Sequence, residues 1–293
     1  MPKNECFWYI GESLLPWEAA AAGALGRALI QGGATINAFA ASGTDALDIP
    51  GILSWRSMTT LERISAALFR GRLWHLWGTP PLWWPLVRFR ARTVHTGFKP
   101  HTEWKGHPTM LSAAGSAGGE TYIPPALEVK VNWSEEGLSQ ETAEDEALTC
   151  LFAGDAENME KYSFPKGLDV GILHIGKDGR EGMAALAAGR AVLLIEEPTP
   201  SLALLAANGA LMGAPSASPP SSFMDEILGR DGYIRLDCAA GPEKIKEALS
   251  LLAGEAGRGA SASARRIAAE QFTPERGAKK LENLYRSLAG RKR

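Results

Sequence analysis

The sequence predicts an α/β protein of two modules, each with a parallel sheet covered by helices. Short apolar runs typical of strands alternate with longer Ala- and Leu-rich runs along most of the chain. All 9 tryptophans lie between Trp8 and Trp133, so the two halves differ in composition. A stretch rich in Ser, Glu and Thr at 132–146 separates these halves, and 293 residues suffice for two ordinary domains.

The first module is predicted from a series of strand-like and helical runs. Cys6 to Ile10 is rich in aromatic residues and ends at Gly11, which is typical of a buried strand. The Ala- and Leu-rich run 17–31 is expected to form a helix that ends at two glycines. A capping box starting at Thr59 predicts an amphipathic helix over 59–70. The other expected strands are 34–41, 72–77, 92–96, 110–113 and 120–123.

The second module repeats the alternation with different residues. Its expected strands are 147–153, 168–175, 191–196 and 233–238, and its expected helices are 183–188, 201–207 and 242–253. The last thirty residues are helical with one break at Phe272-Thr273. Pro274 cannot continue the preceding helix, but it suits the first turn of the next one.

Composition limits the class of protein and its compartment. The chain carries 31 Lys plus Arg against 33 Asp plus Glu, which argues against a globally basic nucleic-acid binder. Its 3 cysteines are widely spaced, so we expect reduced and mostly buried thiols. The N-terminus lacks a signal-peptide pattern, and the longest weakly charged run, 185–195, is too short to cross a bilayer. The expected location is cytoplasmic, alone or in association with the inner face of a membrane.

The C-terminal run 263–288 contains a helix, the Phe-Thr-Pro break and a second helix that ends in a Leu-Tyr-Arg pattern. It resembles the C-terminal signature of GT-B glycosyltransferases, especially family 4 of retaining sugar-nucleotide enzymes, in which the final helix crosses back onto the first domain. The run 169–192 resembles the nucleotide-binding segment of the same family. The resemblance implies two Rossmann-like domains with parallel sheets. It places an acceptor-type domain at 1–132, a shortened nucleotide-type domain at 147–272, and the returning helix at 273–293.

The sequence departs from the family pattern at the expected donor site. The family carries two glutamates eight positions apart, and the aligned positions here are Gly176 and Ala184. Glu181 could supply a shifted glutamate. The arginine expected after the opening glycine of the second domain is missing, because Asp155 stands there. We therefore expect a donor site that is impaired or rebuilt.

The first module supplies three candidate site residues. Gly11 and Glu12 resemble the family's glycine-bearing first loop, and Glu12 is a candidate to contact an acceptor or to act as a base. Alternatively, Glu12 is an ordinary charged residue of a loop. His95 resembles the family's histidine near the sugar and follows a Thr-Val pair at the expected carboxyl end of a strand, where open α/β sheets bind ligands. Its alternative is a structural or surface histidine.

The second module supplies the donor-side candidates. A nucleoside diphosphate requires cations or helix N-terminal amides. The resemblance assigns a phosphate contact to Lys166, which otherwise merely precedes a strand. The remaining candidates are Lys177 and Arg180 for the diphosphate, with Glu181 and Gly182 at the nucleotide or donor sugar. Alternatively, Lys177 and Arg180 belong to a solvated turn, and Glu181 is a carboxylate at the start of a helix, where the helix dipole favours it.

No metal or other cofactor is expected. His75, His101 and His107 lack the spacing of zinc ligands, and the resemblance implies an enzyme that does not rely on a protein-bound metal.

The run Leu73 to Arg92 mixes tryptophans with arginines. It suits a peripheral membrane contact, a site for a phosphate-linked lipid acceptor, or stacking on a sugar ring. It equally suits a core of tryptophans with arginines extending from it.

The leading hypothesis for function is a glycosyltransferase that moves a sugar from a nucleotide-sugar donor to a glycan or lipid-linked acceptor, in polysaccharide or lipopolysaccharide biosynthesis. The alternative is a non-catalytic homologue that acts as a partner or scaffold in glycan assembly, which the missing glutamate, the missing arginine and the short second module favour. A sugar-binding module is a third hypothesis, based only on the tryptophans.

Overall fold

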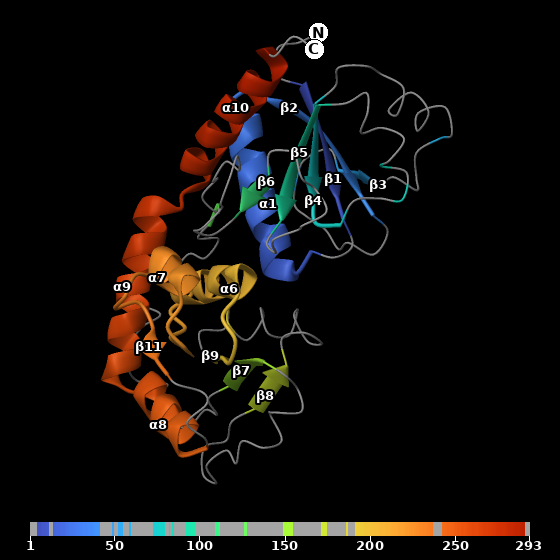
Figure 1. The fold of residues 1–293 in the computed structure, drawn as a ribbon. Coiled ribbons are helices and arrows are strands. Elements are labelled where there is room, and N and C mark those ends of the chain that lie inside the picture. Colours follow the sequence, from blue (N-terminus) through green and yellow to red (C-terminus); the bar gives the residue numbers. More distant parts are fainter. Residues whose placement is uncertain are drawn as a thin grey trace. The chain divides into compact units, whose positions relative to one another are not determined.

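The structure is a computed structural model, and it divides the chain into two compact units. Unit 1 comprises Met1–Leu127 and Phe272–Arg293, and unit 2 comprises Glu128–Gln271 (Figure 1). The structure describes residues 5–11, 14–41, 49, 52–54, 59, 73–79, 82, 84, 92–97, 109–111, 126–127, 149–154, 171–174, 186, 191–236 and 242–290.

Unit 1 contains a six-stranded parallel sheet in the order β3-β2-β1-β4-β5-β6. This is the strand order of a Rossmann fold, in which the chain turns to the other side of the sheet after its third strand. The strands are β1 (Glu5–Ile10), β2 (Thr35–Ala40), β3 (Leu53–Ser54), β4 (Leu73–Trp77), β5 (Arg92–Gly97) and β6 (Thr109–Leu111).

Two helices of unit 1 pack against each other beside the sheet, α1 (Pro16–Gln31) and α10 (Pro274–Gly290) (Figure 1). Glu18 stabilises the start of α1, because its carboxylate accepts a hydrogen bond from the Leu15 N–H at 3.0 Å. Gly33 follows α1 with φ of +89°, a conformation that favours glycine. The last helix of the chain therefore completes the unit that the first strand begins.

Tryptophan forms much of the core of unit 1. Trp8, Trp74 and Trp84 are each at most 1% exposed, and Trp17 and Trp77 are also buried. Their rings pack on one another and on phenylalanine, with ring centroids 5.1 Å apart for Trp8 and Trp77. For the described tryptophans of the run 73–92, the core alternative is confirmed. Leu82 in that run is fully exposed, and its arginines at 88 and 90 lie outside the described residues.

Unit 2 contains a five-stranded parallel sheet in the order β11-β10-β9-β7-β8. This is the flavodoxin-like version of the doubly wound fold, with its change of direction between the first and third strands. The strands are β7 (Thr149–Ala153), β8 (Gly171–His174), β9 (Ala191–Ile195), β10 (Ser216–Ser218) and β11 (Ile234–Arg235). The helices are α6 (Pro200–Leu211), α7 (Ser222–Leu228), α8 (Pro242–Ala253) and α9 (Glu255–Gln271).

Two helices of unit 2, α6 and α7, start at side-chain caps. The Thr199 hydroxyl accepts from the Leu202 N–H, and the Ser221 hydroxyl accepts from the Met224 N–H, both at 3.2 Å. Gly229 ends α7 at a φ of +78°. One core cluster joins the sheet to α8 and includes Phe152, Leu194 and Leu249. Local capping and an apolar sheet face thus lead to the same fold.

The predicted alternation of strands and helices is confirmed, and both sheets are parallel as expected. Two elements were not expected from the sequence: β10, which lies in a segment rich in Ser, Ala and Pro, and α7, which follows that segment. The expected strand 233–238 is only two residues long as β11 within the described residues. The expected helix 59–70 and strand 120–123 lie outside the described residues, apart from Thr59.

Candidate functional site

The strands β1 and β4 form the switch point of unit 1, where ligands of open α/β sheets bind outside the carboxyl ends of the strands. Gly11 directly follows β1, and its N–H donates to the Trp77 carbonyl at 2.9 Å. A Cβ atom at Gly11 would lie 2.6 Å from the carbonyl oxygen of Thr79. Glycine is therefore required here, because two backbone segments are in direct contact at the carboxyl edge of the sheet.

His95 stabilises the turn on the other side of this switch point. Its Nε2 lies 2.7 Å from the carbonyl oxygen of Gly78, so this nitrogen carries a proton and donates. Gly78 has a φ of +74°, and its N–H donates to the Thr96 carbonyl at 3.3 Å. The His95 side chain is only 1% exposed. In this geometry His95 positions the turn after β4 at the edge where Gly11 lies.

A buried polar network connects the same sheet to α10. The Tyr285 hydroxyl accepts from Trp8 Nε1 at 3.0 Å and lies 2.6 Å from His75 Nδ1. His75 Nε2 lies 2.6 Å from the Thr96 hydroxyl oxygen. A neutral imidazole satisfies both contacts, since one ring nitrogen donates and the other accepts.

The groups of this network are neutral because burial disfavours their charged forms. Burial lowers the pKa of His75 well below its ordinary value of 6.5, and the nearby His95 lowers it further. Burial raises the pKa of Tyr285 well above 10 and that of the neighbouring Cys6 to about 12. The network therefore stabilises the docked helix and offers no general acid or base near neutral pH.

Unit 2 has an analogous switch point between β7 and β9. Gly154 directly follows β7, and the Glu196 N–H donates to the Ala153 carbonyl at 2.9 Å. A Cβ atom at Gly154 would collide with the carboxylate and the Cβ atom of Glu196. The absent side chain at Gly154 thus makes room for a carboxylate at the carboxyl edge of the second sheet. The sequence analysis missed Glu196, although it directly follows the well-predicted strand β9.

The structure describes two of the predicted site residues, Gly11 and His95, and brings both to the switch point of unit 1. The other predicted site residues lie outside the described residues: Glu12, Lys166, Lys177, Arg180, Glu181 and Gly182. Leu186, in the expected small-residue helix, is helical and fully buried. Among the residues that the structure describes, no three His, Cys, Asp or Glu side chains lie close enough to hold a metal ion.

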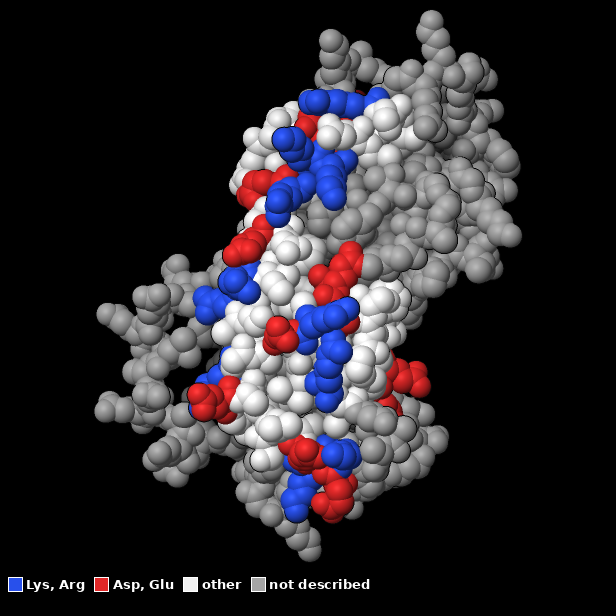
Figure 2. Space-filling view, turned by 60° about the vertical axis from the view of Figure 1, so that its left-hand side comes forward, with Lys and Arg blue, Asp and Glu red and all other residues white. Residues whose placement is uncertain are grey.

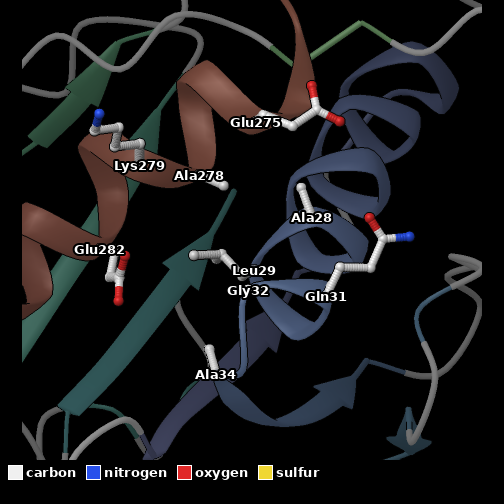
Figure 3. A pocket seen from close by; sticks show the side chains of 9 residues that line it. All are labelled: Ala28, Leu29, Gln31, Gly32, Ala34, Glu275, Ala278, Lys279 and Glu282. Atoms are coloured by element: carbon white, nitrogen blue, oxygen red, sulfur yellow. The ribbon is translucent and has the colours of Figure 1, made fainter.

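A cavity of about 350 Å³ lies between α1 and α10 (Figure 3). Leu29 and Ala34 line one side, and Glu275, Lys279 and Glu282 line the other. Ala34 immediately precedes β2, so this cavity lies at the amino edge of the sheet. It is therefore separate from the switch point of unit 1.

Within the described part of the chain, every helix is too short or too polar to cross a membrane.

Comparison with known proteins identifies the fold. No protein-family model and none of the curated proteins matches the chain. A glycosyltransferase from Rickettsia africae ESF-5 matches with a TM-score of 0.60 and 12% identity over 100% of both chains. Anabaena Alr3699/HepE in complex with UDP-glucose matches with a TM-score of 0.61 and 8% identity, over 97% of this chain and 99% of that one. WaaG, a glycosyltransferase involved in lipopolysaccharide biosynthesis, matches with a TM-score of 0.55 and 9% identity, over 96% of this chain and 99% of that one.

These matches confirm the expected architecture of two Rossmann-like domains with parallel sheets, which is the GT-B fold. At identities of 8 to 12%, the likeness is one of fold and does not assign an activity to this chain.

Proposed function

We propose that this protein is a glycosyltransferase that moves a sugar from a nucleoside diphosphate donor to a glycan or lipid-linked acceptor. The observation that carries the proposal is the paired construction of the two sheets, each with a glycine at the carboxyl edge of its switch point, where a Cβ atom would not fit. Similarity to a UDP-glucose complex over nearly the whole chain supports a nucleotide-sugar donor. A retaining outcome, as in family 4, belongs to the same proposal.

In this proposal unit 2 binds the donor. Glu196 is the described carboxylate at its switch point and would accept hydrogen bonds from hydroxyl groups of the donor. Lys166, Lys177 and Arg180 would neutralise the diphosphate as it departs, and Glu181 with Gly182 would contact the nucleotide or the sugar. Glu196 would then supply a carboxylate in a chain that has Gly176 and Ala184 at the positions of the family's two glutamates.

Unit 1 binds the acceptor in this proposal. Gly11 allows the backbone after β1 to pack against that of Thr79 at the carboxyl edge of the sheet, and Glu12 would act as a base or bind an acceptor hydroxyl. His95 would act as a positioning residue through the Gly78 turn, because its Nε2 already bonds that carbonyl. A direct contact between Nε2 and a sugar would require that hydrogen bond to break. Similarity to WaaG supports an acceptor in lipopolysaccharide or polysaccharide synthesis, and a site at the inner face of the membrane is proposed with it.

A second candidate is a non-catalytic homologue that binds a partner in glycan assembly. Gly176 and Ala184 occupy the positions of the family's two glutamates, which favours this candidate. It shares the fold but predicts no turnover.

Isothermal titration with UDP, GDP and their glucose conjugates tests both candidates. We expect one nucleotide to bind with a Kd between about 1 μM and 1 mM. Gly154→Ala should abolish binding because the new methyl group displaces Glu196, whereas Lys246→Ala, an exposed change in the same unit, should leave it unaltered. Release of UDP with an acceptor extract separates an enzyme from a non-catalytic binder. A protein that binds no nucleoside diphosphate at millimolar concentration would contradict the proposal.

A further inference from the structure

The charges of this chain are unevenly distributed along its length. The last 20 residues, 274–293, carry 7 Lys or Arg against 2 Glu. The first 273 residues carry 24 Lys or Arg against 31 Asp or Glu. A nearly neutral protein thus ends in a strongly basic segment, most of which is the helix α10.

The fold determines which side of α10 carries these cations. Ala278, Leu281, Leu284 and Tyr285 are buried in unit 1, and at 100° per residue they cover an arc of about 120°. The exposed cations of the helix cover an arc of similar width, about 120°, on the opposite side. They are Arg276, Lys279, Lys280 and Arg286.

We call these four side chains the cationic face of α10. Figure 2 shows blue side chains gathered on the described surface along α10. The two glutamates of the helix, Glu275 and Glu282, lie at one border of this arc and line the cavity beside α1 (Figure 3). Glu282 pairs with Arg286, whose side chain is 63% exposed. The face as a whole therefore carries an excess of positive charge.

We propose that the cationic face of α10 binds the surface of an anionic lipid bilayer. A helix of 17 residues is about 25 Å long. Because the apolar side of α10 is docked on unit 1, its cations lie on the opposite side of the helix, where a flat surface can contact them. Each Lys or Arg near an anionic membrane contributes about 1 kcal/mol.

The cationic face carries no apolar side chain that could enter the bilayer. Between its cations the exposed residues are polar, namely Asn283 and Ser287. Binding is therefore electrostatic, reversible and sensitive to salt. Single-stranded nucleic acid is a poorer fit, since the exposed part of α10 offers no aromatic ring for base stacking.

This surface differs from the aromatic run 73–92 considered from the sequence. Trp74, Trp77 and Trp84 of that run are buried in the core of unit 1 and cannot contact lipid while unit 1 is folded. The proposal also does not depend on the glycosyltransferase activity, because it concerns charges on α10 and not either switch point.

Sedimentation of the full-length protein with lipid vesicles tests the proposal. Vesicles of phosphatidylcholine alone are compared with vesicles that also contain phosphatidylglycerol. We expect binding only to the anionic vesicles. Raising NaCl from about 0.1 M to about 1 M shortens the Debye length from about 10 Å to about 3 Å, so the protein should dissociate.

The variant Lys279→Gln/Lys280→Gln removes two cations from the face. At about 1 kcal/mol each, the partition coefficient should fall by about 30-fold. The control Lys244→Gln/Lys246→Gln removes two exposed cations from α8 in unit 2 and should change it by less than about twofold. Both pairs of side chains are exposed, so an unchanged midpoint of urea unfolding verifies that each variant is folded.

Three results would overturn the proposal. The first is equal binding to neutral and anionic vesicles. The second is undiminished vesicle binding by Lys279→Gln/Lys280→Gln. If Arg88→Gln/Arg90→Gln lost vesicle binding instead, the membrane contact would belong to the aromatic run. The third is salt-sensitive binding of the protein to duplex DNA without binding to either kind of vesicle.

Discussion

Replacing Tyr285 by phenylalanine removes one oxygen atom from the junction between α10 and the sheet of unit 1. The ring remains, so no large cavity forms. The lost hydroxyl leaves Trp8 Nε1 without its acceptor at 3.0 Å and His75 Nδ1 without its partner at 2.6 Å. Trp8 and His75 are both 0% exposed, so water cannot replace the hydroxyl without a rearrangement.

The expected loss follows from the two buried groups left unsatisfied. Each such group costs about 1 to 3 kcal/mol, so the two together should lower the free energy of unfolding of Tyr285→Phe by about 2 to 6 kcal/mol. Tyr233→Phe is a matched control in unit 2. Its hydroxyl donates to Asp225 at 2.8 Å, but that carboxylate is 31% exposed and also binds Arg235. The control should therefore cost only about 0.5 to 1.5 kcal/mol.

Urea unfolding measures both variants when it is followed by far-ultraviolet circular dichroism, which reports on both units, and by tryptophan fluorescence. All tryptophans except Trp133 belong to unit 1, so the fluorescence signal reports mainly on that unit. A loss for Tyr285→Phe no larger than that for Tyr233→Phe would refute the reasoning, because it would show that the hydroxyl is not a buried partner of both groups.

Three further predictions concern unit 1 and the buried thiols. Gly11→Ala places a methyl group 2.6 Å from a backbone carbonyl oxygen and should destabilise the protein by about 1 to 3 kcal/mol in urea unfolding. As a control, Gly259→Ala in α9 adds a methyl group that meets no other atom, and it should stabilise the protein by about 0.5 to 1 kcal/mol. Because burial lowers the pKa of His75, protonation of this side chain favours the unfolded chain. The free energy of unfolding should therefore be constant well above pH 6.5 and fall by up to about 1.4 kcal/mol per pH unit below it. His75→Gln should remove this contribution to the pH dependence. Burial raises the pKa of Cys6 and Cys150 to about 12, so a thiol reagent at pH 8 should modify at most one of the 3 cysteines in the native protein and all of them in urea.

The fold was predictable because its signals are local and redundant. The buried strand after Glu5, the helix that stops at Gly32 and the break before Pro274 each follow from a short stretch of sequence. The missed strand Ser216–Ser218 lacks such a signal, since its three residues are small and two are polar. It forms because parallel pairing with β9 and β11 satisfies its backbone in a buried setting.

The candidate site was predictable only in part, since it depends on contacts between distant segments. The glycine after β1 stood out in the sequence, but the reason for it is the backbone of Thr79, nearly seventy residues away. His95 was expected at an edge where ligands bind, and its bond to Gly78 could not be inferred from spacing. Glu196 was not predicted, because a carboxylate after a strand points to a site only once its contact with Gly154 is known.

The division of unit 1 between the two ends of the chain also determines the order in which a new chain can become complete. Unit 2 is one continuous stretch and has all its residues once Gln271 has been made. Unit 1 begins before unit 2 but requires α10, which is synthesised after unit 2. At 5 to 20 residues per second, roughly 10 to 30 s pass between the synthesis of Leu127 and that of Gly290. During that time Trp8 and His75 lack the Tyr285 hydroxyl, so this part of the core of unit 1 is incomplete, and it remains so in a chain truncated before α10.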